Sequence, residues 1–294
     1  MDIRRLKLFC EVCRQGSYSL AAKKAGLTQS AVSQQVRALE RDLGVALFDA
    51  DDRSRPTAAG DFLFREGGRL LAQMDDVENG IRHVAGVGAG TVRFGMIDVA
   101  AIWLLPGVLT RFKEAYPQVK VEAVVKTSGE LIELVERHAI DFAIVVTNRI
   151  PDSLVKKDIY EDSIVAVVPR RSHLNRRQIS VRDLRGEPLI LYPASSYSRM
   201  LIDDIFRANG VVPAVSMEMH YPAAILSLVR QGMGVGLVSE LSAREMKLRG
   251  QAVVRIEELE GKREIGIVSH RGRRPSPQAR ELVKMIEKLK SSGL

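Results

Sequence analysis

The chain of 294 residues carries 44 Lys and Arg against 36 Asp and Glu, which gives a formal net charge of +8 and a pI of ≈ 9.6. This length predicts two or three folding units, and a hydrophobic content of 46% suffices for packed cores. The positive charge favours an anionic partner such as nucleic acid, although a role in solubility also explains it.

The first residues, MDIRRLKLFCEV, contain neither the apolar core nor the cleavage site of a signal peptide. The longest apolar run, Val99 to Leu109, has 11 residues and contains Pro106, whereas a membrane span needs about 20 residues. We therefore expect a soluble, cytoplasmic protein.

The first predicted helix begins at Asp2, a capping residue, and ends at Gly16. Its inward-facing positions share one helical stripe: Ile3, Leu6, Phe9 and Cys13. Cys10 and Cys13 also have the C-x-x-C spacing of redox and zinc sites, but no second cysteine pair or nearby His supplies the remaining zinc ligands. Because a buried free cysteine packs as a small hydrophobe, we predict core cysteines, no metal site and no cofactor.

The second and third predicted helices follow closely. Ser19 caps the second, SLAAKKAG, and Gly26 stops it because glycine tolerates a positive φ. Thr28 then caps the third helix, so two brief helices joined by a tight turn predict a helix-turn-helix. Lys23 and Lys24 suit DNA phosphates, as do the free backbone amides at the start of the third helix.

The third predicted helix has two faces. Apolar residues at helical spacing predict a buried stripe: Val32, Val36, Leu39 and Leu43. Polar residues follow the same spacing on another face: Ser30, Ser33, Gln34, Arg37 and Arg41. There Gln can pair with adenine, Ser can donate or accept, and Arg can bind guanine or a phosphate. The alternative is a solvated face of a small bundle, but the front of this helix lacks the charges that solubility favours.

The following residues, LGVALFDADDRSRPTAAG, contain a helix stop at Gly44 and predict two short strands around a polar turn, which form a wing. From Thr57 a helical pattern runs to about Val84 and is interrupted by Gly67 and Gly68. Its apolar positions recur in alternating steps of three and four: Leu63, Leu70, Met74, Val77, Ile81 and Val84. Such a seam predicts a coiled coil with a partner helix, and hence a homodimer with two recognition helices on two half-sites.

The run from Arg4 to about Val84 resembles the LysR-type transcriptional regulators, through LKLFCEVCRQGSYSLAAKKAGLTQSAVSQQVRALERDLGVALF and then RPTAAG. The resemblance implies a winged helix-turn-helix DNA-binding domain at 1–58, a linker and dimerisation helix at 59–88, and an effector-binding α/β domain at 91–294. It also implies DNA contacts at Gln29, Ser30, Ser33, Gln34 and Arg37, with Arg53 and Arg55 on the wing. Lys23, Lys24 and Thr28 complete the candidate DNA contacts.

The wing departs from the family pattern. Family members usually place an acidic or polar residue and then Arg after the Leu-Phe pair, but LFDADD places Ala50 there. Asp49, Asp51 and Asp52 make the wing entrance acidic. We therefore expect the wing to rely on Arg53 and Arg55 and the recognition helix to carry more of the DNA contact.

After the connector GVGAG at 86–90, predicted strands alternate with helices, which argues for parallel α/β units. The strands are TVRFGMI, VKVEAVV, DFAIVV, SIVAVVP, PLILY, AVSMEM, GVGLVS, AVVRI and EIGIVSH. The helices cover WLLPGVLTRFKEAY, 128–138, 197–208, AAILSLVRQ and about 277–289. The resemblance implies two lobes like those of periplasmic binding proteins, about 91–162 with 268–294 and about 163–267, whose crossovers act as a hinge.

An effector is expected in the cleft between these lobes, where strand ends meet helix starts. The candidate contacts are Asp98, Val99, Ala100, Thr127, Ser128, Ser195, Ser196, Ser198 and Tyr221. Hydroxyls and free amides there favour a small anion, although each hydroxyl has the alternative role of an N-cap. Asp98 either caps its own helix or selects an effector that bears an amino group.

The run GMGVG, Gly232 to Gly236, invites a dinucleotide-binding interpretation. Its glycines follow a helix and enter a strand, whereas a phosphate-binding fingerprint follows a strand and opens a helix. We therefore predict a helix C-cap and a tight turn.

The sequence thus predicts a sequence-specific DNA-binding regulator of transcription that a small-molecule effector controls. It acts on a dyad operator in double-stranded DNA as a homodimer or homotetramer, with RNA polymerase as a further candidate partner. One alternative is a DNA-architectural protein without a ligand. Another is an enzyme built on the α/β lobes, against which stands the lack of a nucleophile elbow, P-loop or metal cluster in the sequence.

Overall fold

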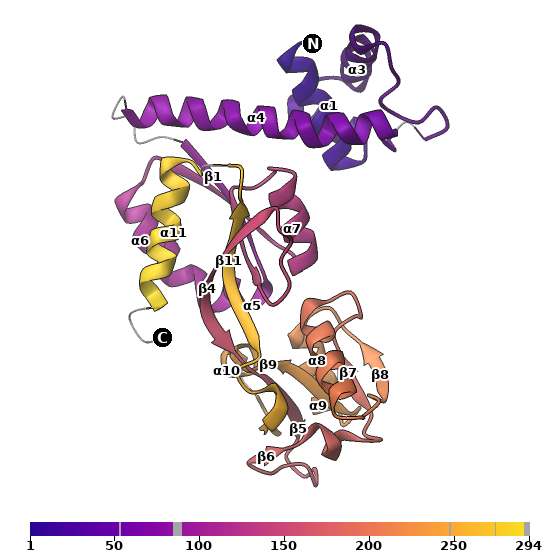
Figure 1. Ribbon diagram of the computed structural model, residues 1–294, viewed down its shortest axis with the longest axis vertical. Helices are drawn as coiled ribbons and strands as arrows, with labels where there is room; N and C mark the ends of the chain where they lie inside the picture. Colours follow the sequence, from indigo (N-terminus) through magenta and orange to yellow (C-terminus); the bar gives the residue numbers. More distant parts are fainter. Residues whose placement is uncertain (53, 85–89, 247, 274, 291–294) are drawn as a thin grey trace. The chain divides into compact units, whose positions relative to one another are not determined.

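The computed structural model describes residues 1–52, 54–84, 90–246, 248–273 and 275–290 (Figure 1). The chain forms two compact units, residues 1–87 with 136–139 and residues 88–135 with 140–294. Across the described residues, the helices are too short or too polar to cross a membrane.

The first unit contains four helices, α1 (Ile3–Gln15), α2 (Tyr18–Ala25), α3 (Gln29–Leu43) and α4 (Ala58–Val84). The Asp2 carboxylate accepts hydrogen bonds from the amides of Arg4 and Arg5, which confirms the predicted cap of α1. Thr28 likewise caps α3 by accepting from the amide of Ala31 at 3.2 Å. Glycines with a left-handed conformation end the first three helices, as predicted: Gly16, Gly26 and Gly44.

The cap of α2 was predicted at the wrong serine. Ser17 has an extended backbone, and its hydroxyl accepts from the amide of Leu20. Ser19 lies inside the helix, where its hydroxyl donates to Oε1 of Gln29 at 3.2 Å. The cap of α2 lies two residues earlier than predicted, because Ser17 directly follows Gly16, the residue that ends α1.

A small core joins α1, α2 and α3. Leu6, Phe9, Val32 and Leu39 are 0% exposed, as the helical stripes predict. Two stripe residues were wrongly placed inside, since Ile3 is 43% and Leu43 38% exposed. Both lie at helix ends, beyond the reach of so small a core.

The cysteines pack as predicted. Cys10 is fully buried in this core, and Cys13 packs against it partly buried. Burial raises the pKa of the Cys10 thiol to about 11 and that of the Cys13 thiol to about 12. Both thiols are therefore protonated and unreactive at neutral pH.

The wing is slighter than the sequence predicted. Instead of two strands, the described residues show an isolated antiparallel bridge between Phe48 and Pro56. The amide of Asp49 donates to the carbonyl of Arg55 at 2.9 Å, which closes the turn. Polar groups of the turn satisfy one another locally, so fewer cross-strand pairs form. Arg53 lies outside the described residues.

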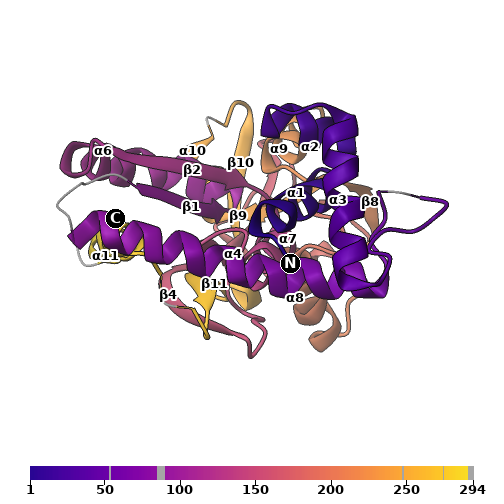
Figure 2. The same cartoon turned by 90° about the horizontal axis from the view of Figure 1, so that it is seen from above.

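Helix α4 is continuous from Ala58 to Val84 (Figure 2). Gly67 lies within it at a close approach to α1, because a Cβ there would stand 2.6 Å from Cδ1 of Leu6. A glycine in this part of the pattern thus lets α4 pack against α1.

The second unit contains two sheets. The first lobe has strand order β2-β1-β3-β11-β4 and packs against α5, α6, α7 and α11 (Figure 1). Its strands are β1 (Gly90–Met96), β2 (Val119–Val125), β3 (Phe142–Val146), β4 (Leu154–Asp162) and β11 (Arg263–His270). Its helices are α5 (Asp98–Trp103), α6 (Leu105–Ala115), α7 (Ser128–Glu136) and α11 (Pro277–Lys290). The helix predicted over WLLPGVLTRFKEAY is α6, which begins two residues later than predicted with Pro106 in its first turn, and α5 precedes it.

The second lobe has strand order β6-β10-β5-β9-β7-β8. Its strands are β5 (Ile164–Pro169), β6 (Gln178–Ile179), β7 (Leu189–Leu191), β8 (Val215–Glu218), β9 (Val235–Ser239) and β10 (Gln251–Ile256). Its helices are α8 (Tyr197–Ala208), α9 (Pro222–Arg230) and α10 (Glu240–Glu245), with short 3-10 turns η1 (Val181–Leu184) and η2 (Glu257–Leu259). Alternate residues of β5 are buried on opposite faces of this sheet, against α8 and α9.

Two expectations for these lobes need correction. The sheets are mixed rather than parallel, since β11 runs antiparallel to β3 and β4, and β5 runs antiparallel to β9 and β10. The return crossover lies near Arg263 rather than 268, because all of β11 pairs within the first lobe. In both crossovers a strand leads to the next strand without an intervening α-helix, so the parallel βαβ rule does not apply.

The glycines of GMGVG form a turn, as predicted. Gly232 has φ 76° after the end of α9, and Gly234 has φ 150° before β9. A Cβ on Gly234 would stand 2.3 Å from the carbonyl oxygen of Pro188.

Gly234→Ala is therefore expected to destabilise the second unit by about 2 kcal/mol or more, because the clash is with backbone and the φ is unfavourable. Gly107→Ala is the control, since a Cβ on Gly107 meets nothing within 4 Å. Urea unfolding of both variants measures the difference. Equal stability of the two would contradict this structural role.

Candidate DNA-binding surface and effector site

The polar face of α3 is open to solvent. Gln29, Ser30, Gln34 and Arg37 are exposed, and Ser33 is half-buried. On the opposite face, Val32, Val36 and Leu39 are at most 1% exposed. The helix therefore presents the predicted polar side chains while its apolar stripe fixes it to its domain.

Gln34 and Arg37 are the most available side chains of this face. Within the described residues, neither has an internal hydrogen-bond or ion-pair partner. Arg41 is also exposed, but it lies in the last turn of α3, far from the N-terminal end that would enter a groove.

The start of α3 is partly occupied by local contacts. Thr28 accepts from the amide of Ala31, and its hydroxyl lies 3.0 Å from that of Ser30. Gln29 accepts from Ser19 of α2. These contacts assign Thr28 a capping role and tie the start of α3 to α2.

The two candidate lysines of α2 differ. Both are exposed, but Nζ of Lys24 lies 2.8 Å from Oε1 of Glu11. Lys23 has no such ion pair among the described residues, so it is the freer group for a phosphate.

The wing entrance is acidic and locally bonded. The Asp52 carboxylate accepts from the hydroxyl and the amide of Ser54, and these hydrogen bonds lower its pKa. Asp49 accepts from the amide of Asp51 at 3.0 Å. Arg55, which is exposed, therefore acts beside several carboxylates.

An apolar stripe continues along the outer part of α4. Leu70 is 39%, Val77 63% and Ile81 65% exposed, although their spacing is that of a buried seam. Leu63 and Met74 are half-buried, and the side chain of Val84 is not among those that the structure describes. An isolated chain therefore exposes three of the six predicted seam positions, whereas Leu63 packs against the core of the first unit.

The first-lobe effector candidates have local partners. Asp98 accepts from the amide of Val99 at 2.8 Å, as a residue at the start of its own helix. Val99 and Ala100 are buried in the core of the lobe, so their side chains cannot meet a ligand.

The other two first-lobe candidates are helix-start residues. Thr127 donates to Oε2 of Glu130 at 2.8 Å, and the Glu130 carboxylate accepts in turn from the Thr127 amide. Together with Lys126, these bonds lower the pKa of Glu130 to about 2. Ser128 is buried and accepts from the amide of Val146 at 3.1 Å. The hydrogen bonds of the Thr127 and Ser128 hydroxyls therefore fit a capping or structural role.

The second-lobe candidates are more open. Ser195 is exposed, Ser196 is half-buried at the start of α8 without a side-chain cap bond, and Tyr221 is 66% exposed at the start of α9. Ser198 differs, because it is buried and accepts from Nε of Arg263 at 3.1 Å.

A buried ion pair at the two crossovers was not predicted from the sequence. Arg263 and Asp162 lie 2.5 Å apart with side chains only 5% and 1% exposed. Asp162 also accepts from the amides of Ser163 and Leu241. The pair joins the start of β11 to the end of β4, and through Ser198 it reaches α8 of the second lobe. No local pattern marks it, since the partners are 101 residues apart.

Tyr192, also missed, lies next to this pair. Burial raises the pKa of its hydroxyl, the Arg263 charge lowers it, and the Asp98 charge raises it. The charge of Asp98 in the first lobe thus acts on the buried hydroxyl of Tyr192 in the second lobe. Because Tyr192 follows strand β7, the strand-end rule applied to the other candidates would have identified it.

Two family models match the chain. "Bacterial regulatory helix-turn-helix protein, lysR family" covers residues 3–61, and "LysR substrate binding domain" covers residues 85–290. The transcriptional dual regulator GltC of Bacillus subtilis (strain 168) is 30% identical over 290 residues, which cover 97% of this chain and 96% of GltC. The HTH-type transcriptional regulator CbbR of Rhodospirillum rubrum is 28% identical over 288 residues, 97% of this chain and 95% of CbbR.

Solved structures share the fold. Full-length CbnR in complex with its target DNA is 23% identical, with a TM-score of 0.68 over 98% of this chain and 99% of CbnR. Full-length BenM is 22% identical, with a TM-score of 0.63 over 99% of this chain and 97% of BenM. At this identity the likeness concerns the fold alone.

Proposed function

The chain belongs to the LysR family of transcriptional regulators, and we propose that α3 recognises its operator while the second unit binds the effector that controls this recognition. The observation that carries the proposal is the two-sided helix α3. Its exposed side chains Gln34 and Arg37 stand opposite a stripe that is at most 1% exposed. Such a helix presents donors and acceptors to base edges while its own domain holds it in place.

We assign the DNA contacts by availability. Gln34 and Arg37 are the principal base-reading side chains, with Ser30, Ser33 and Gln29 beside them on the same face. Lys23 is the leading phosphate contact. The first backbone amides of α3, apart from that of Ala31, which Thr28 caps, are assigned to DNA phosphates as well. Thr28 and Lys24 act mainly through their internal bonds. On the wing we assign the DNA contact to Arg55, which lies within the described residues.

We propose that α4 pairs with α4 of a second copy. The exposed stripe of Leu70, Val77 and Ile81 has the spacing of a coiled-coil seam. A dimer of this kind presents two copies of α3 to two half-sites of a dyad. We further propose that the protein forms a homotetramer, contacts RNA polymerase and is located in the cytoplasm.

The effector is proposed to be a small anion or an amino-bearing acid at the junction of the lobes. Ser195, Ser196 and Tyr221 contribute open hydroxyls at helix starts, and the charge of Asp98 acts on the hydroxyl of Tyr192 in the second lobe. An effector that binds the closed arrangement of the lobes more tightly than the open one shifts the population toward the closed state. We propose that the chain works by binding rather than by turnover, which its similarity to proteins named transcriptional regulators supports.

A thermal-shift screen of the full chain with amino acids and small organic acids tests the effector site. At about 100 times its dissociation constant, an effector is expected to stabilise the second unit by about 2.7 kcal/mol. Tyr221→Phe and Ser195→Ala are expected to weaken that shift. Gly107→Ala, in open space on α6, is expected to leave it unchanged.

The outcomes of this screen separate the functions. A stabilising compound that also changes operator affinity supports the regulator. Sequence-specific binding with no response to any compound favours a DNA-architectural protein. Chemical conversion of a bound compound would support an enzyme and contradict the proposal.

A further inference from the structure

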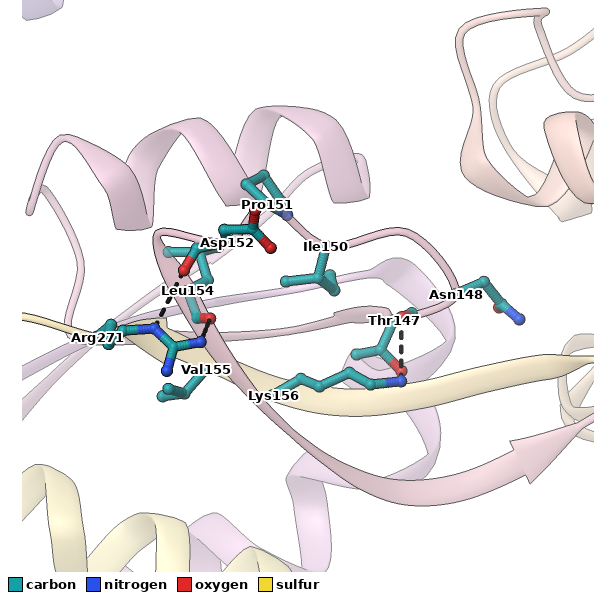
Figure 3. Close-up of a pocket in the computed structure, with 9 residues that line it drawn as sticks. All are labelled: Thr147, Asn148, Ile150, Pro151, Asp152, Leu154, Val155, Lys156 and Arg271. Atoms are coloured by element: carbon teal, nitrogen blue, oxygen red, sulfur yellow. Dashed lines mark hydrogen bonds between the residues drawn. The ribbon is translucent and has the colours of Figure 1, made fainter.

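A separate pocket of about 450 Å³ lies within the first lobe (Figure 3). The loop at 147–153 forms one side, and the start of β4 and Arg271, directly after β11, form the other. Its volume is in the range of about 300–1,000 Å³ that is usual for small-molecule sites. None of the effector candidates at the lobe junction lines it.

Arg271 is the distinctive charged group of this pocket. Its Nε donates to the carbonyl of Asp152 at 3.1 Å, and an Nη donates to the carbonyl of Leu154 at 3.4 Å. Among the described residues it forms no ion pair with a carboxylate. Two backbone carbonyls thus hold a guanidinium whose charge is not neutralised, and Figure 3 shows it beside Leu154 and Val155.

The other cation of the pocket is neutralised. Nζ of Lys156 lies 2.8 Å from Oε2 of Glu264 and 3.2 Å from Oδ2 of Asp158. These partners and their charges raise the pKa of Lys156, against the effect of burial. A ligand anion therefore gains more from Arg271 than from Lys156.

The remaining lining residues define the body of a ligand. Ile150, Pro151 and Val155 supply an apolar wall beside the guanidinium, whereas the Leu154 side chain is 3% exposed and belongs to the core of the lobe. Asp152, which is exposed, adds one negative charge to the lining. An apolar wall suits a hydrocarbon body, a guanidinium suits one carboxylate, and the Asp152 carboxylate disfavours a second negative group.

We propose that this pocket is a second ligand site, which binds a small organic monocarboxylate through Arg271 and its apolar wall. The site is distinct from the effector site at the lobe junction. Its chemistry depends on residues of the first lobe alone.

The pocket loop also touches the second lobe. Arg149 forms an ion pair with Asp204 of α8. Asn148 donates to the carbonyl of Lys262 at 2.8 Å and accepts from the amide of Glu264 at 3.1 Å, beside the crossover into β11. A ligand that orders this loop therefore acts on contacts between the lobes.

Titration of the full chain with 4-fluorobenzoate, followed by the fluorine NMR line width, tests the site. The neutral isostere 4-fluorobenzamide is expected to bind at least about tenfold more weakly than 4-fluorobenzoate, because it cannot form the charge-assisted hydrogen bond. Arg271→Gln is expected to lower the affinity for 4-fluorobenzoate about tenfold. Asp152→Asn is expected to raise it, because that change removes the repelling charge.

Two further variants separate this site from structural effects and from the lobe junction. Ile150→Trp fills the pocket, keeps Arg271 and is expected to abolish binding. Ser195→Ala, at the junction, is expected to leave the affinity unchanged. Equal binding of acid and amide, wild-type binding by Arg271→Gln or Ile150→Trp, or no binding of 4-fluorobenzoate at 10 mM (roughly a weak-fragment limit) would each overturn the proposal.

Discussion

Replacing Gln34 and Arg37 together by alanine is expected to abolish operator preference without unfolding the protein. Both side chains are exposed, and neither supports the core of the first unit. Each base contact of this kind contributes about 1–3 kcal/mol of discrimination. The loss of two contacts per half-site therefore weakens operator binding by at least about 30-fold, while binding to random DNA changes little.

A matched control is the double variant Arg4→Ala with Gln15→Ala on α1, which also removes one cation and one glutamine. It is expected to retain sequence preference. Single variants assign the contacts further. If Arg37 binds a phosphate, Arg37→Ala weakens all sequences evenly and reduces the salt slope by about one. Unchanged preference in the Gln34 and Arg37 double variant would show that α3 is not the recognition helix.

Val77→Glu with Ile81→Glu is expected to separate the dimer. These positions are 63% and 65% exposed in the single chain, so charged side chains there cost the monomer little. In a coiled-coil seam the same charges face each other across the dyad and are desolvated. A monomer loses the second half-site, and its operator affinity is expected to fall about 100-fold or more.

Sedimentation and operator titration measure the two effects on the same samples. Val77→Leu with Ile81→Leu keeps the seam apolar and is expected to remain a dimer with its affinity intact. Thermal unfolding of the first unit serves as the check on folding. A glutamate variant that stays dimeric would place the dimer contact elsewhere.

Local features of the first unit could be predicted because their causes are adjacent in the chain. The cap at Thr28 and the stops at Gly26 and Gly44 depend on residues within one turn. The burial of Val32 and Leu39 follows from spacing alone. The exposure of Ile3 and Leu43 does not, because it depends on how far a three-helix core extends.

Features of the second unit depended on distant residues. The buried pair of Asp162 and Arg263 joins positions 101 residues apart, and neither residue has a local signal. The antiparallel strands β4 and β11 arise at the crossovers, where alternation of strand and helix fails. The pocket beside Arg271 also combines a loop with the end of a strand more than 100 residues away, so spacing could not reveal it.

Selection of bound DNA from a random pool by the full chain tests the central claim most directly. A two-sided α3 in a dimer joined through α4 predicts enrichment of one dyad sequence. Its half-sites should lie about 10 base pairs apart, or a multiple of this spacing, and the Gln34 and Arg37 double variant should lose it. Enrichment of no sequence, or of the same dyad by the double variant, would contradict recognition through this helix.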